Sequence, residues 1–519
     1  MTTKFTKEQL ALLEAHQRLG HSGTMSRREM VGAGVMAGTA GIAIPSVLEI
    51  IGDMLGFGRA YGVEASTCVG GLSGTAPTHI NLHLESGWNA GGAFLIAGKQ
   101  ELGQPIQYLE PASYASLGYA SAAAPQARTP NTDFGHPAHS AATFTTKLSS
   151  FLPAAVKAKS RAFMITGVSA DDSPNALSSE FFSLGAIGQR GGLVQIVENQ
   201  AVGQYLPAGD FRDPTQTRAI VSNSAALVQL VGAGQLGELF GGREGAIKIA
   251  KAIDSMGSTR VNAFHAMGFN DQLRRLVQCN YALSPELLKN FTPENLDPAS
   301  DSSFVNAKLA DNSTPFTAST AAPGAASLAG ANEGTEATAL AIITKLCADG
   351  NARFGRAQLS GFDYHGRGRA NNDDRDTFAA KMVASVINAF AIKAKPVFIT
   401  ISTSGAVSCS GTADANGKIP STADSGARSN VMGIAFHPTA APVMKFSQIG
   451  KYNETGAVET SSSGGVQANN ITNLAKVVAA NYAAFAGKYP AYAEFLRQVG
   501  ASNPIAGQEN KYIMFDMPG

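Results

Sequence analysis

Short apolar runs alternate along this chain with longer segments of helical periodicity, and this alternation most constrains the fold. Several of the runs are apolar at consecutive positions, which is typical of strands in a sheet covered on both faces. Strands separated by helices indicate an α/β fold, with a mostly parallel sheet and helices on both sides. The predicted strands are 79–86, 161–169, 192–198, 396–403 and 430–436, and the predicted helices are 244–256, 335–348, 374–393 and 470–486.

The strongest helical pattern covers residues 374–393. Asp373, Asp374 and Asp376 would lie in its first turn, where carboxylates stabilise the positive end of the helix dipole. A single apolar stripe predicts the face that packs on the sheet. The stripe consists of Phe378, Met382, Val383, Val386, Ile387 and Phe390.

With 519 residues the chain is long enough for a substantial core. We expect one large α/β domain over 66–519, preceded by an N-terminal segment over 1–65. Residues 297–334 are rich in Ser, Ala and Pro and predict a long surface loop within the domain.

Charged residues make up 15% of the chain, against about 25% in ordinary soluble domains, so the surface should be mostly neutral and polar. Lys and Arg number 40 and Asp and Glu number 39, which gives a net charge of +1. The sequence contains no basic block that could bind along a phosphate backbone. Nucleic acid is therefore not an expected partner.

The four cysteines are Cys68, Cys279, Cys347 and Cys409. Their wide spacing contains no Cys-x-x-Cys pair, which excludes a zinc ribbon and a thioredoxin-like motif. Three disulfide pairings stay open. Cys347 falls in a helical pattern, where we expect a small buried apolar residue.

Near the N-terminus, Arg27 and Arg28 follow a serine and precede a Gly/Ala-rich apolar run that ends at Pro45. This is the layout of a twin-arginine leader. It predicts export of the folded protein by the twin-arginine translocase to the periplasm or cell surface. A cytosolic amphipathic helix is disfavoured by the many small residues, and a membrane span by an apolar run shorter than about 20 residues.

Two outcomes are open for the leader after export. Small residues suitable for cleavage occur at Gly62 and Ala65. Residues 46–55, however, carry apolar side chains at helical spacing and could pack on the body of the protein. In that case the leader stays uncleaved.

Two other motifs have simpler interpretations, and a third is absent. Gly232, Gly234 and Gly237 follow the dinucleotide-binding order, with Asp254 near the spacing of a ribose-binding acid, but a chain with 56 glycines produces such matches readily. Asp171 with Asp172 follows a strand, yet the pair is equally good turn chemistry. No Gly-x-Ser-x-Gly elbow supports a Ser-His-Asp hydrolase.

Two histidine pairs fit either zinc or ordinary polar packing. His79 and His83 would face the same side of a strand, and His136 and His139 would share a loop. Neither pair has an acidic or thiol partner close in sequence. Ordinary buried histidines are therefore the preferred interpretation.

A further motif places Asp363 and His365 two residues apart, after a strand-like run. A particular order of elements accompanies it: a strand with a glycine-bearing turn, the Asp-x-His motif, a long helix, and a strand ending in Thr-Ser. With the Arg-Arg leader, this order resembles an uncharacterised exported family of the alkaline phosphatase and sulfatase superfamily. The stretches concerned are "LHLESGWNAGG", "GFDYHGRG", "DTFAAKMVASVINAFAIKAKPVFITISTSG" and "ADSGARSNVMGIAF".

The resemblance implies Asp and His ligands for one or two divalent metals, such as zinc or manganese, at the carboxyl ends of the strands. Asp363, His365 and Asp424 match ligand positions, and Ser86 matches the position of a nucleophile. The chain departs from the family at Asn89, where relatives have an acid, and at Ser425, where they have a histidine. Gly405, Ala406 and Val407 likewise replace the usual acid and arginine after Thr-Ser.

These departures favour a non-catalytic binding or assembly protein of the bacterial cell envelope, with a degenerate active site and no cofactor. Its expected partner is another envelope protein or a further copy of itself. The alternative is a metal-dependent hydrolase of phosphate or sulfate esters. In the first case Asp363 should accept hydrogen bonds at the strand end and orient the ring of His365.

Overall fold

The computed structural model describes residues 77–93, 96, 98–99, 104–169, 194–200, 218–223, 226, 293–318, 333–460, 466 and 468–516. Several predictions lie outside these residues. They concern the leader over 1–65, the glycine motif at 232–237 with Asp254, Asp171 and Asp172, the helix over 244–256, and Cys68 and Cys279.

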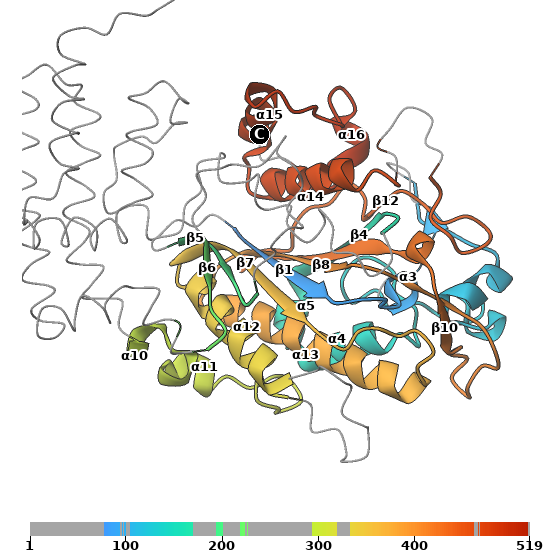
Figure 1. Ribbon diagram of the computed structural model, residues 1–519, viewed down its shortest axis with the longest axis horizontal. Coiled ribbons are helices and arrows are strands. Elements are labelled where there is room, and N and C mark those ends of the chain that lie inside the picture. Colours follow the sequence, from blue (N-terminus) through green and yellow to red (C-terminus); the bar gives the residue numbers. More distant parts are fainter. Residues whose placement is uncertain are drawn as a thin grey trace, which may run out of the picture.

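An eight-stranded sheet forms the centre of the described structure, in the order β12-β4-β11-β8-β1-β7-β5-β6 (Figure 1). β11 runs antiparallel to its neighbours β4 and β8, whereas the other neighbouring strands pair in parallel. The bounds are β1 Thr78–Leu84, β4 Ser160–Thr166, β5 Val194–Glu198, β6 Arg218–Ile220, β7 Ala352–Leu359, β8 Val397–Thr403, β11 Asn430–Phe436 and β12 Gln448–Ile449.

Helices cover both faces of this sheet (Figure 1). One face packs on α4 (Thr143–Phe151), α12 (Glu333–Ala348) and α13 (Arg369–Ile392), and its apolar core includes Ile80 and Leu82 of β1. The other face packs on α14 (Ile471–Phe485) and α15 (Tyr489–Gln498). The predicted α/β class with a mostly parallel sheet is confirmed.

Short elements complete the described fold. Two small two-stranded sheets pair β2 with β3 and β9 with β10. The bounds are α3 Ala90–Ala93, β2 Gly98–Lys99, β3 Gln107–Tyr108, η2 Pro111–Leu117, η3 Ser121–Ala123, α5 Ala154–Ala158, α10 Pro293–Leu296, η8 Pro298–Ser300, α11 Ser302–Val305, β9 Val407–Cys409, β10 Ser421–Asp424, η9 Gly426–Arg428 and α16 Glu509–Tyr512.

The loop predicted over 297–334 contains two short helical segments, η8 and α11, and α12 already begins at its end. Asp297 and Asp301 each accept a hydrogen bond from a backbone amide two residues later, which starts these segments. The compositional bias of the segment concealed these local caps.

The long helix α13 begins at Arg369 after Gly368, earlier than predicted. Asp373, Asp374 and Asp376 therefore lie beyond its first turn, and the prediction that they stabilise the helix start was wrong. The predicted apolar stripe, from Phe378 to Phe390, is buried. Helix α13 therefore packs on the sheet through the helix face that was predicted.

Candidate functional site

Three neighbouring parallel strands, β8, β1 and β7, end at the same edge of the sheet, and the loops that follow them form the candidate site. The loops are joined through their backbones. The amide of Tyr364 donates to the carbonyl of Gly87 at 3.1 Å, and the amide of Gly405 donates to the carbonyl of Ser86 at 3.0 Å. Parallel strands place their carboxyl ends together, which is where α/β sheets bind ligands.

His365 and Asp424 are brought together at this edge. The Nδ1 atom of His365 lies 2.7 Å from Oδ2 of Asp424, and the side chains are 51% and 27% exposed. Asp424 comes from the end of β10, in the connection between β8 and β11. Because Nδ1 faces the carboxylate, Nε2 is the ring nitrogen left for another partner.

Asp363 is used differently from expectation. Its Oδ1 atom accepts a hydrogen bond from the amide of His365 at 3.1 Å, so the carboxylate stabilises the turn of its own loop. The prediction that Asp363 accepts a hydrogen bond is confirmed, but the bond lies within the loop after β7 and not at the strand end. The prediction that Asp363 orients the imidazole was wrong, since the ring of His365 is held by Asp424.

Ser86 lies in the loop after β1 with φ of 74°, a left-handed conformation that non-glycine residues rarely adopt. Its backbone is fixed by β8: the amide donates to Oγ of Ser404 at 2.9 Å, and the carbonyl accepts from Oγ1 of Thr403 at 2.6 Å. Such over-determined strain is common at functional sites. The loop is therefore rigidly placed beside the loop that carries His365.

Asn89 is buried beneath the loops. Its amide nitrogen donates to the carbonyl of Leu117 at 3.2 Å and lies 3.6 Å from Sγ of Cys409. The side chain is thus engaged by η2 and β9. Cys409 and Cys347 are both buried free thiols, and for Cys347 this confirms the predicted burial.

Within the described part of the chain, no three His, Cys, Asp or Glu side chains gather as metal ligands would. The structure brings His365 and Asp424 together and places Asp363 beside them through the backbone. Ser86 belongs to the adjacent loop. Metal binding by Asp363, His365 and Asp424 stays a prediction.

Asp376, expected only as a helix-start carboxylate, lies instead under both loops and was not predicted to belong to the site. Its Oδ1 atom accepts hydrogen bonds from Nε1 of Trp88 at 2.8 Å and from the hydroxyl of Tyr364 at 2.7 Å. Burial raises the pKa of this carboxyl group to about 6, against the lowering effects of Arg369, Trp88 and Tyr364. A signal was present, because Asp376 shares a helix face with Ala380, Val383 and Ile387 at helical spacing.

Further charged side chains, centred on Asp373, lie next to Asp376. Asp373 pairs with Arg369 at 3.2 Å and with Lys418 at 3.1 Å, and Oγ1 of Thr143 donates to it at 2.7 Å. These contacts connect α13 to α4 and to the segment before β10. The start of α13 is thereby fixed in place under the candidate site.

The two histidine pairs have ordinary polar partners. His79 and His83 face the same side of β1, as predicted, where Nε2 of His79 lies 2.9 Å from Thr400 Oγ1 and Nδ1 of His83 lies 3.3 Å from Ser402 Oγ. Burial, with a smaller effect from Arg356, lowers the pKa of His83 to about 3. His83 is therefore neutral at physiological pH.

The pair in the loop before α4 is also buried. Nδ1 of His136 lies 2.6 Å from Oγ of Ser447, and the ring of His139 stacks on Tyr119 with centroids 3.6 Å apart. Burial lowers the pKa of His136 to about 3 and that of His139 to about 4. These contacts favour the packing interpretation over a zinc pair.

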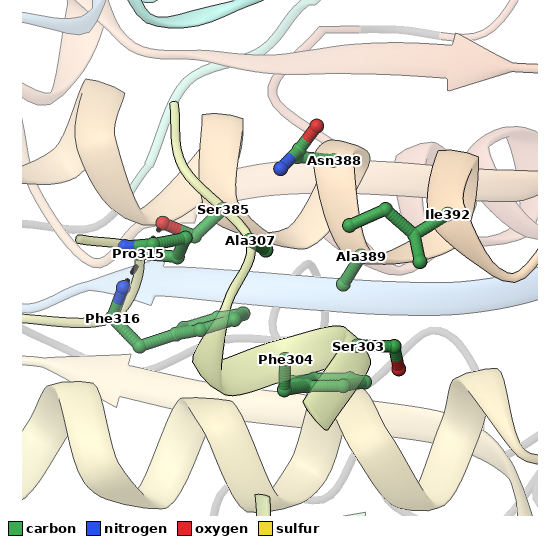
Figure 2. Close-up of a pocket in the computed structure, with 9 residues that line it drawn as sticks. All are labelled: Ser303, Phe304, Ala307, Pro315, Phe316, Ser385, Asn388, Ala389 and Ile392. Atoms are coloured by element: carbon green, nitrogen blue, oxygen red, sulfur yellow. Dashed lines mark hydrogen bonds between the residues drawn. The ribbon is translucent and has the colours of Figure 1, made fainter. Parts of the chain in front are cut away.

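A small pocket lies elsewhere, between α11 and the second half of α13 (Figure 2). Phe304 and Phe316 stack in its wall, and the amide of Phe316 donates to Oγ of Ser385. Ser385 follows Arg369 by about 24 Å along the helix, at roughly 1.5 Å per residue. The pocket is mostly apolar and separate from the candidate site. Its lining consists of Ser303, Phe304, Ala307, Pro315, Phe316, Ser385, Asn388, Ala389 and Ile392.

The fold and site together define an α/β protein with a mixed, mostly parallel eight-stranded sheet and a polar site at its carboxyl edge. Comparisons with protein-family models, curated proteins and solved structures found no match to this chain. Among the described helices, none has the length and apolar character needed to cross a membrane.

Proposed function

We propose that this chain is an exported binding or assembly protein of the cell envelope, built on a fold of the alkaline phosphatase and sulfatase type. Its partner is another envelope protein or a second copy of the chain. The proposal treats the site at the carboxyl edge as a remnant of a metal centre that no longer hydrolyses esters.

The 2.7 Å contact between His365 and Asp424 is the observation that carries this proposal. A histidine whose Nδ1 is hydrogen-bonded to a carboxylate binds a metal through Nε2, on the opposite side of the ring. Asp424 then supports the histidine from behind and is not itself a ligand of the same ion. Asp363 accepts a hydrogen bond from an amide of its own loop, and among the described residues no three His, Cys, Asp or Glu side chains gather as the ligands of a catalytic zinc would, which supports this interpretation of the site.

A metal-dependent ester hydrolase is the second candidate, and one observation favours it. A carboxylate behind an exposed imidazole is the arrangement that supports many metal-binding histidines. Rotation of Asp363 away from its own loop would add a second ligand. The two candidates therefore differ in metal content and in turnover.

The deciding experiment uses the purified full chain, dialysed against zinc or manganese and then against metal-free buffer. The proposal expects no stoichiometric metal by elemental analysis and no hydrolysis of p-nitrophenyl phosphate or p-nitrophenyl sulfate. A chelator should leave the melting temperature unchanged, because a bound metal stabilises a folded protein in proportion to its occupancy.

Matched histidine variants complete the test. His365→Asn removes the candidate ligand, and His437→Asn removes a histidine whose Nδ1 interacts locally with Thr439. Under the proposal both variants retain the metal content and activity of the wild type. One bound metal per chain, with ester hydrolysis that His365→Asn abolishes and His437→Asn retains, would establish the hydrolase instead.

A further inference from the structure

Two of the loops that form the candidate site meet at one buried oxygen atom. Trp88 of the loop after β1 and Tyr364 of the loop after β7 both donate to Oδ1 of Asp376, at 2.8 Å and 2.7 Å. Trp88 directly precedes Asn89, and Tyr364 lies between Asp363 and His365. Tyr364 is therefore adjacent in the chain to two candidate site residues, and Trp88 lies two residues after a third, Ser86.

We propose that Asp376 is the positioning residue of this site, whose carboxylate holds the two loops together and so keeps His365 against Asp424. The inference rests on the proposed function only in taking His365 and Asp424 as the site. It is independent of whether the site binds a partner or hydrolyses an ester.

Burial makes the arrangement specific. Trp88 is 0% exposed, Tyr364 1% and Asp376 2%, so neither donor can exchange its hydrogen bond for one to bulk water. A carboxylate is the side chain that accepts two such donors on one oxygen most favourably. Loss of the acceptor leaves the buried indole N–H of Trp88 unsatisfied. It leaves the Tyr364 hydroxyl with the carbonyl of Asn372, 2.9 Å away within the same segment, so the bond between the loop and Asp376 is lost. Both changes favour displacement of the loops.

The backbone carries this displacement to the exposed histidine. The amide of Tyr364 donates to the carbonyl of Gly87. This bond joins the two loops a second time, close to their hydrogen bonds to Asp376. A Cβ atom built on Gly87 would lie 3.6 Å from Oδ1 of Asp424, so the first loop also borders the partner of His365. A shift of either loop therefore changes the His365–Asp424 contact.

Several charged or titratable groups act on Asp376. Arg369 and Asp373 come from its own helix, with opposite effects on its pKa, and Tyr364 comes from the loop after β7. Tyr119 faces it from the segment after η2, and Lys418 acts through its ion pair with Asp373. Arg369 is the cation among these groups with the largest effect on Asp376.

The test uses Trp88, which is the only tryptophan in the chain. Tryptophan fluorescence therefore reports only on the surroundings of Trp88 and its hydrogen bond to Asp376. Asp376→Ala should shift the emission of Trp88 to longer wavelength. It should also increase several-fold the rate at which diethyl pyrocarbonate modifies His365, measured by peptide mass spectrometry against His437. Asp376→Asn retains an acceptor oxygen and should restore both values.

The pH profile provides a readout that a purely structural residue would not change. In the wild type, Trp88 emission should titrate with a midpoint near the pKa of Asp376, about 6. Asp376→Asn should abolish this transition. Tyr364→Phe removes a hydrogen bond that favours the ionised form and should move the midpoint upward.

Asp374→Ala is the matched control, because it removes a carboxylate from the same helix and should leave both readouts unchanged. If Asp376→Ala does not fold, Tyr364→Phe supplies the same test on one loop, with faster modification of His365. Wild-type modification rates in a folded Asp376→Ala or Tyr364→Phe variant would overturn the proposal. Because no readout involves a metal, partner or ester, the result is distinct from any failure of the proposed function.

Discussion

At the scale of single residues, Asp376 should make stability depend on pH. Burial raises its pKa from 3.8 to about 6, so the folded chain binds this proton more tightly than the unfolded chain. The resulting stabilisation is complete below pH 3.8 and is lost as pH rises through about 6. In Asp376→Asn this loss is absent. Relative to wild type, its free energy of unfolding should rise by up to about 3 kcal/mol between about pH 4 and pH 8.

Urea unfolding of both proteins across this range measures the difference, and other titrating groups cancel in the comparison. Asp374→Asn serves as the reference and should show a nearly constant difference from wild type. A constant difference for Asp376→Asn as well would show that Asp376 has the same pKa in both states.

The exposed pair of the site should matter little for stability. His365 is about half exposed and Asp424 about a quarter, and such pairs contribute about 0–1 kcal/mol. Asp424→Asn should therefore lower the free energy of unfolding by less than about 1 kcal/mol in thermal or urea unfolding. A much larger loss would mean that the carboxylate has a buried structural role.

The residue positions of the site were only partly predictable. The Asp-x-His spacing identified Asp363 and His365, but no local pattern could pair His365 with Asp424, because the pair depends on how β10 returns to the sheet edge. Asp376 could have been noticed as a carboxylate on an apolar helix stripe. Its two donors, Trp88 and Tyr364, could not, since only the tertiary fold brings them together.

At the scale of elements, close packing of β11 against β4 predicts an asymmetry between two glycines. A Cβ atom on Gly433 would overlap the ring of Phe163, its partner in β4, whereas one on Gly334 in α12 would meet nothing within 4 Å. Gly433→Ala should therefore destabilise by about 1–3 kcal/mol through overpacking. Gly334→Ala should be neutral or stabilise by up to about 1 kcal/mol.

Thermal unfolding of the two variants measures this contrast. Both substitutions add one methyl group at a glycine, so the chemical change is matched and the surroundings differ. A Gly433→Ala protein as stable as wild type would mean that Phe163 can move aside without loss of packing.

Element prediction succeeded where side-chain patterns were simple and failed where polar groups are buried. The strands β1, β4, β5, β8 and β11 were predicted within a few residues of their bounds. β7 was noticed only as a strand-like run before Asp363, without bounds, because Arg353, Arg356 and Gln358 interrupt its apolar pattern. Arg356 is 1% exposed, and the Asn199 amide group bonds both the amide and the carbonyl of Gln358, which are contacts that a sequence window does not contain.

At the scale of the whole molecule, the α/β class followed from the alternation of elements, but the strand order did not. β1 lies in the middle of the sheet between β7 and β8, which come more than 250 residues later in the chain. The reversed direction of β11 is likewise set by its tertiary partners. Helix and strand periodicities predict which faces are buried, but they do not predict which strands are neighbours.

Export is the property of the whole chain that the sequence predicts most directly. Arg27 and Arg28 should present the leader to the twin-arginine translocase, so changing both to lysine should leave folded protein in the cytoplasm. The same change at Arg59 retains the charge and lies outside the pair, and this control should be exported normally. Fractionation of a bacterial host that has the translocase measures both. Wild-type export of the double variant, or retention of the Arg59→Lys control, would contradict recognition of the pair.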